Sequence, residues 1–101
     1  MAVLFTHTFK GVDPSDAVRD YAERKFAALV NKFVHEEGTR AHCTYKTEGI
    51  HQRIEVHLSV GGNDIHASAD GDKVYSAIDR AIEVVEQQLR KRKEKLVRHH
   101  G

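Results

Sequence analysis

The chain has 101 residues, a length that supports one hydrophobic core, so we expect a single domain spanning residues 1–101. Val, Leu, Ile and Phe make up about a quarter of the residues and the formal net charge is +1, which excludes the composition of a disordered chain. The apolar runs are too short to cross a bilayer, and the single cysteine, Cys43, allows no internal disulfide. These features predict a folded, cytoplasmic protein with no membrane segment.

The positive charge is concentrated at the C-terminus. Residues 90–101 carry six basic side chains against one glutamate, whereas the first 89 residues carry more acidic than basic side chains. A basic end on a mildly acidic body favours an oriented encounter with a polyanion or with an acidic protein surface.

The first half of the chain predicts a strand and then a helix. Residues 2–9 are rich in β-branched and aromatic side chains, which is typical of a strand. Two N-caps remain open for the helix that follows, Asp13 and Ser15. Apolar residues then recur at spacings of three and four as far as Phe33, and the helix should end near residues 35–38.

Three further strands are expected, at residues 40–47, 53–60 and 65–69. The last two should form a hairpin with Gly62–Asn63 as its two-residue loop, a register that pairs Leu58 with Ala67. Apolar side chains then share one face of the sheet, and the opposite face meets solvent or a partner. This opposite face holds Glu55, His57, Ser59, His66 and Ser68.

A long helix closes the chain, with an apolar stripe from Val74 to Leu89. An eight-residue strand spans only about 26 Å, so the basic segment from Arg90 should overhang the domain as a helical extension or a frayed tail. The order β-α-β-β-β-α with one apolar sheet face predicts a two-layer α+β sandwich, a four-stranded sheet with two helices packed on one face.

Motifs for catalysis are missing from the sequence. It contains no glycine-rich phosphate loop and no zinc-binding spacing, so we expect no enzyme, no catalytic residue, no metal and no cofactor. His57, His66 and Ser68 gather on the open sheet face, but such a face cannot exclude water, which favours solvated strand residues. The basic residues are the one positive signal. They lie on a flank of each helix, where they could grip phosphates or simply complement the helix dipole.

Three segments carry a family resemblance. HASADGDKVYSAID at residues 66–79, QQLRKRKEKL at 87–96 and YAERKFAALVNKF at 21–33 resemble the ribosome hibernation promoting factor family. This bacterial family is also known as ribosome-associated inhibitor A, protein Y or sigma factor modulation proteins. Without a second domain, the chain is similar to the short form of the family.

The resemblance implies a fold akin to double-stranded-RNA-binding domains. It further implies that the protein binds the small ribosomal subunit and its rRNA in the mRNA and tRNA channel and inhibits translation under stress or in stationary phase. The isolated protein is expected to be a monomer, and a second small factor in ribosome dimerisation is left open as a partner. The alternative is a protein-interaction regulator, for example of a sigma factor, that uses the acidic body and the exposed sheet face.

Helix spacing and the resemblance together give the expected RNA-binding residues. Many family members have lysine or arginine at the positions of Ala28, Val84 and Gln87, where this chain has none. The expected set is Lys25, Lys32, Lys73, Arg80, Arg90, Lys91, Arg92, Lys93, Lys95 and Arg98.

Overall fold

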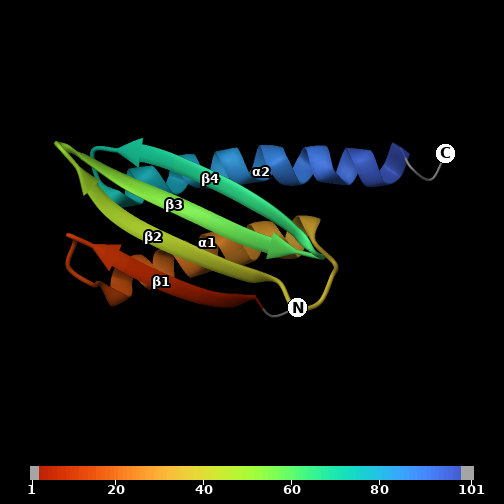
Figure 1. Cartoon of the computed structure of the whole chain (residues 1–101), viewed down its shortest axis with the longest axis horizontal. Helices are drawn as coiled ribbons and strands as arrows, with labels where there is room; N and C mark the ends of the chain where they lie inside the picture. The colour runs from red at the N-terminus through yellow and green to blue at the C-terminus, as the bar shows by residue number, and fades with distance from the viewer. Residues whose placement is uncertain (1–2, 99–101) are drawn as a thin grey trace.

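The computed structural model describes residues 3–98, with side chains described for residues 3–93. Its elements follow the order β-α-β-β-β-α that the sequence predicts. Figure 1 shows both helices on one side of the sheet, so the expected two-layer α+β architecture is confirmed. The elements are β1 (Leu4–Lys10), α1 (Asp16–Phe33), β2 (Arg40–Glu48), β3 (His51–Val60), β4 (Asn63–Gly71) and α2 (Val74–Arg98).

The four strands form one sheet in the order β1-β2-β3-β4. β1 and β2 are parallel, and α1 makes the crossover that a parallel pair requires, whereas the other two pairs are antiparallel. α2 returns across the sheet after β4. The two helices therefore run in the same direction, and their C-terminal ends lie at the same end of the sheet (Figure 1).

The hairpin between β3 and β4 differs from the expected one. Leu58 pairs with Ile65, so the loop is Gly61–Gly62, and the expected loop of Gly62 and Asn63 is wrong. Both loop glycines have positive φ, +52° and +81°, which a two-residue hairpin turn favours. The pairing partners on β4 shift by two residues. Because side chains alternate with a period of two, the same side chains face the core in both registers.

The core lies between the sheet and the two helices, as the apolar stripes predict. Ala67 and Ala69 of β4 face the helices, and their small side chains let α2 approach the sheet closely. In the part of the chain that the structure describes, neither helix combines the length and apolar character that crossing a bilayer requires. Fully buried residues include Ala22, Phe26 and Val30 of α1, Tyr45, Ile54 and Leu58 of the sheet, and Ile78, Ala81 and Val85 of α2.

Ser15 caps α1, which settles the choice between the two expected N-caps. Its backbone is extended, and its hydroxyl accepts a hydrogen bond from the backbone N–H of Val18 at 3.2 Å. Asp16, in the first turn, places negative charge at the positive end of the helix dipole. The helix ends at Phe33, because Val34 adopts an extended conformation.

Replacing the cap tests this assignment. We expect Ser15→Ala to lower the free energy of unfolding by about 1 kcal/mol, because the Val18 N–H loses its acceptor. Ser15→Asp should keep most of the stability, since aspartate also caps helices. Urea unfolding of the three proteins measures the difference. Identical midpoints for Ser15→Ala and the parent protein would show that this cap does not stabilise α1.

Candidate nucleic-acid interface

The two helices share an outer surface on the side of the domain away from the open sheet face. Near the N-terminal ends, the rings of Tyr21 in α1 and Tyr75 in α2 meet edge to face, with centroids 5.0 Å apart. Towards the C-terminal ends, the Arg90 guanidinium of α2 lies 5.3 Å from the ring centre of Phe33 in α1. The helices therefore stay side by side, and their cations can be compared along one surface.

The N-terminal half of this surface carries mixed charge. The Lys25 ammonium lies 5.4 Å and the Arg24 guanidinium 5.9 Å from the ring centre of Tyr21. The Tyr21 hydroxyl donates a hydrogen bond to Asp79 at 2.6 Å, and this bond raises the pKa of the hydroxyl. Asp79 therefore offsets part of the positive charge that Lys25 brings.

The C-terminal half gathers cations around one aromatic ring. The Lys32 ammonium lies 5.4 Å from the ring centre of Phe33, and the Arg90 guanidinium on the neighbouring helix lies 5.3 Å from the same centre. Arg90 donates two hydrogen bonds to one oxygen of Glu86, at 3.0 and 2.5 Å. The Arg90 hydrogen bond, with the charges of Arg90 and Lys32, holds the pKa of the Glu86 carboxyl below its usual value.

Arg92 is engaged inside the domain. Its guanidinium forms an ion pair with Glu36, in the loop between α1 and β2, and only 17% of its side chain is exposed. The other carboxylate oxygen of Glu36 accepts a hydrogen bond from the His35 N–H at 3.3 Å. Burial raises the pKa of the Glu36 carboxyl, but the hydrogen bond and charge of Arg92 outweigh it, and the pKa lies below its usual value.

The other expected cations of α2 lie far apart. Lys91 and Lys93 are exposed, whereas Lys73 precedes the first turn of α2, about 27 Å from Lys91 at 1.5 Å per residue. Arg80 is exposed, but its guanidinium donates a hydrogen bond to the backbone oxygen of Asp70 at 2.6 Å. These residues are therefore spread along the length of α2 and do not gather at one point.

Only part of the expected set gathers in one place. Lys25, Lys73 and Arg80 lie at the start or middle of the helices. Backbone positions 95 and 98 belong to α2, but the side chains of Lys95 and Arg98 lie outside the described residues.

Figure 1 shows this last part of α2 running on past the sheet, so the overhang is a helical extension. We call the gathered cations the basic end, which comprises Lys32, Arg90, Lys91, Arg92 and Lys93.

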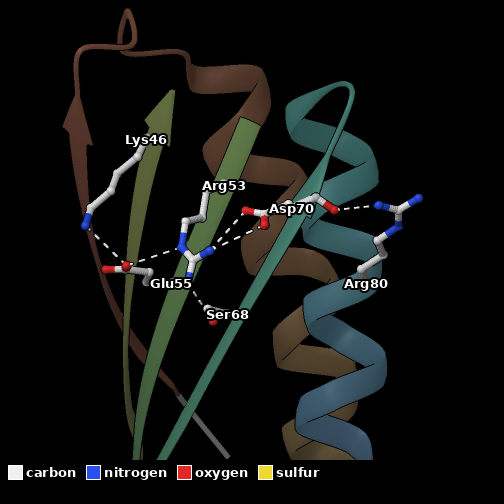
Figure 2. A network of polar contacts seen from close by, with 6 residues as sticks. All are labelled: Lys46, Arg53, Glu55, Ser68, Asp70 and Arg80. Atoms are coloured by element: carbon white, nitrogen blue, oxygen red, sulfur yellow. Dashed lines mark hydrogen bonds and ion pairs between the residues drawn. The ribbon is translucent and has the colours of Figure 1, made fainter. Parts of the chain in front are cut away.

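The open sheet face is the competing surface, and many of its charges are paired with one another. Figure 2 shows the guanidinium of Arg53 between two carboxylates, 3.5 Å from Glu55 and 3.3 Å from Asp70. Arg53 also donates to Ser68 at 3.1 Å, and Lys46 lies 3.2 Å from Glu55. The hydrogen bond from Lys46 is the main cause that lowers the pKa of the Glu55 carboxyl. This network leaves little unbalanced charge on its part of the face.

Three histidines cross the open face in register, with His42 opposite His57 and His57 opposite His66. The rings of His57 and His66 stack with centroids 4.2 Å apart, and His57 Nε2 lies 3.2 Å from Asp64. They border a shallow hollow of about 350 Å³ that is open to solvent. Within the described residues, no group of three or more histidine, cysteine or acidic side chains could hold a metal ion.

Sequence reasoning missed two residues in or beside the helical surface. Glu36 is 56 residues from its partner Arg92, and no local pattern joins a loop residue to a distant helix. Arg24 does not share the seven-residue spacing that joins Lys25 and Lys32 on one side of the helix. The helical neighbour rule would have found it, since Arg24 follows Tyr21 by three residues and lies over its ring.

The sequence matches a family model over nearly its whole length. The model is described as Sigma 54 modulation protein / S30EA ribosomal protein, and it matches residues 5–97. The chain belongs to this family. The resemblance seen in the sequence motifs is therefore confirmed, and the matched range of the S30EA family includes α1, all of α2 except its last residue, and the basic end.

Relatives within the S30EA family are named ribosome hibernation promoting factor. The protein of Klebsiella oxytoca is 36% identical over 92 residues, which cover 91% of this chain and 95% of that protein. The protein of Escherichia coli strain K12 is 35% identical over the same shares of the two chains. In Azotobacter vinelandii the identity is 35% over 86 residues, which cover 85% of this chain and 78% of the relative.

Solved structures share the fold. A ribosomal subunit interface protein from Coxiella burnetii superposes with a TM-score of 0.78 at 24% identity, covering 89% of this chain and 97% of that one. The N-terminal domain of Thermus thermophilus Protein Y gives a TM-score of 0.77 at 25% identity, covering 90% and 98%. The four-stranded sheet with two helices on one face is therefore the architecture of these proteins as well.

The pairing of Arg90 with Glu86 can be tested in the isolated domain. We expect Arg90→Ala to raise the pKa of the Glu86 carboxyl towards its usual value of 4.5, because the charged form loses its hydrogen bonds. An NMR titration of the Glu86 side-chain carboxyl measures this pKa. Lys91→Ala removes the same charge one residue further along and should leave the pKa nearly unchanged. If Arg90→Ala also leaves it unchanged, the pair does not form in solution.

Proposed function

We propose that this protein is a ribosome hibernation factor that binds the small ribosomal subunit in the mRNA and tRNA channel. By occupying the channel, it inhibits translation under stress or in stationary phase, in the cytoplasm. Membership of the S30EA family supports the role, and the basic end is the observation in this structure that carries it.

The proposed mechanism is steric and electrostatic. Phosphate contacts supply affinity without reading sequence, so a few cations on a rigid helix suffice to hold a domain against rRNA. The body of the domain then fills space that mRNA and tRNA need. The partners are the small ribosomal subunit and its rRNA, and the mechanism includes no catalytic step.

The alternative partner is another protein, bound on the open sheet face. The network around Arg53 argues against it, because a partner would have to desolvate Glu55 and Asp70, whose charges are already balanced. Exposed Lys91 and Lys93 have no ion pair with a described side chain, so contact with phosphate breaks no interaction seen in the described part of the chain. This difference favours rRNA.

Cosedimentation with purified small subunits across a salt series tests the proposal. We expect binding in competition with tRNA and mRNA, and a linear fall of log affinity with log salt. Replacing Lys91 and Lys93 by alanine should flatten the slope by about 1.4 to 1.8, since each phosphate contact contributes about 0.7 to 0.9. A separate sedimentation of whole ribosomes, with and without a cell extract that could supply a second small factor, tests for dimerisation, because paired ribosomes sediment faster.

A matched control removes two exposed cations from the sheet side of the domain. Lys10→Ala combined with Arg40→Ala changes the net charge by the same amount and should leave the slope almost unchanged. Absence of cosedimentation at low salt would refute the proposal. Equal flattening in the two double variants would move the contact away from the basic end.

A further inference from the structure

The ion pair of Arg92 with Glu36 lies where three distant segments meet. Arg92 belongs to α2, Glu36 to the loop after α1, and Gly61 to the turn between β3 and β4. A Cβ atom built on Gly61 would lie 2.7 Å from a carboxylate oxygen of Glu36 and 3.4 Å from the Arg92 guanidinium. The backbone of the β3–β4 turn therefore packs directly against the Arg92–Glu36 ion pair.

Both partners of this pair are held more firmly than in an ordinary surface ion pair. One carboxylate oxygen of Glu36 faces Arg92, and the other accepts the backbone N–H of His35. Among the described residues, Glu36 supplies the acceptor for the Arg92 guanidinium, whose Nε is buried without a partner. Loss of the carboxylate would leave a mostly buried cation uncompensated, which is far more disruptive than the loss of an exposed pair.

The pair also marks the point where α2 leaves the domain. Leu89, 1% exposed, is the last core residue of α2 among the described side chains. Arg92 lies almost one turn later, beside the β3–β4 turn, and residues 93–98 continue for about 9 Å beyond it. Beyond the contact of Arg90 with Phe33, the Arg92 pair is therefore the last ion pair between α2 and another segment among the described residues, and it helps to fix the direction of the helix.

We propose that Arg92 is a positioning residue, which with Glu36 fixes the end of α2 so that Lys91 and Lys93, which project from different sides of the helix, each reach an rRNA phosphate. This inference rests on the proposed function and deepens it. A helix end that is already ordered loses less freedom on binding, so its phosphate contacts give more affinity. Arg92 then supports binding through its neighbours, and the direct phosphate contact expected for it from the sequence is replaced by an indirect role.

Glu36→Gln separates this role from simple electrostatics. The change removes a negative charge beside the basic end, so charge alone predicts tighter binding to rRNA. Positioning predicts the opposite, a loss of about three- to tenfold in affinity with an unchanged salt slope, because the cations remain but are less well ordered. Glu37→Gln removes the same charge from the exposed neighbouring residue, and it should bind as the parent protein does or slightly better.

Variants of Arg92 distinguish positioning from direct contact. Arg92→Gln should weaken binding as much as Glu36→Gln does and leave the salt slope within about 0.3 of the parent value, whereas loss of a phosphate contact would lower it by about 0.7 to 0.9. The exchanged pair, Glu36→Arg with Arg92→Glu, rebuilds the ion pair with reversed polarity. It should restore affinity to within about twofold of the parent protein, because the net charge is unchanged.

The glycine turn provides a second, independent pair of variants. Gly61 and Gly62 both have positive φ, so alanine strains the backbone at either position. Only a Cβ at position 61 would displace the Glu36 carboxylate, since a Cβ at position 62 meets nothing within 4 Å. We therefore expect Gly61→Ala to reproduce the affinity loss of Glu36→Gln and Gly62→Ala to bind as the parent protein does.

Amide hydrogen exchange of the free domain tests the pair without ribosomes. Exchange of the amides of residues 90–93 should be at least about threefold faster in Glu36→Gln than in Glu37→Gln. If the parent protein fails to bind small subunits, the proposed function is refuted. Whatever the binding result, equal exchange rates of these amides in the two variants would overturn the positioning role. If the parent protein binds and Glu36→Gln binds as tightly as Glu37→Gln, the positioning role is overturned as well.

Discussion

Burial of the apolar sheet face beneath two helices determines where the cations of this domain lie. One face of the sheet carries Tyr45, Ile54 and Leu58, and these side chains are removed from water only if both amphipathic helices pack on the same side. The parallel β1–β2 pair and the returning α2 make the helices run in the same direction. Their C-terminal ends thus meet at one end of the sheet. Lys32 of the shorter helix and Arg90 of the longer one then lie against the same ring, that of Phe33, although 58 residues separate them in sequence.

The arginines and the lysines of this surface make different kinds of contact. Arg80, Arg90 and Arg92 each bond to a group inside the domain, a carbonyl or a carboxylate, as suits a planar guanidinium with several donors. Lys91 and Lys93 remain exposed, and a lysine is a flexible, strongly hydrated point charge. Arg80 and Arg92 therefore bind α2 to other segments and Arg90 is paired within α2, whereas Lys91 and Lys93 are available to an external phosphate. Counting all basic residues therefore overestimates the positive charge that this surface has available for an external phosphate.

The features of the fold that depend on a local sequence pattern could be predicted from the sequence. The apolar stripe to Phe33 and the alternation in the strands depend on period, and the structure agrees with both. The overhang was expected from Arg90, but Arg90 and Arg92 still contact the domain, so α2 extends past it only after Arg92. The hairpin loop was misplaced by one residue, which shifts the strand pairing by two, and a pairing shift of that size leaves every side chain on its own face. The pair of Arg92 with Glu36 could not be anticipated, since it depends on how loops and helix ends meet in three dimensions. Family motifs supplied the function, which composition and periodicity left open between a polyanion and a protein partner.

Site-directed cross-linking tests most directly which surface meets the ribosome. Cys43 is buried, and burial raises the pKa of its thiol to about 12, so a cysteine introduced at the surface can be labelled selectively. A photoreactive probe would be attached in Lys93→Cys, at the basic end, and in His57→Cys, on the open sheet face. The account predicts cross-links to small-subunit rRNA from position 93 and few from position 57. Strong cross-links to rRNA from position 57 with none from position 93 would contradict it.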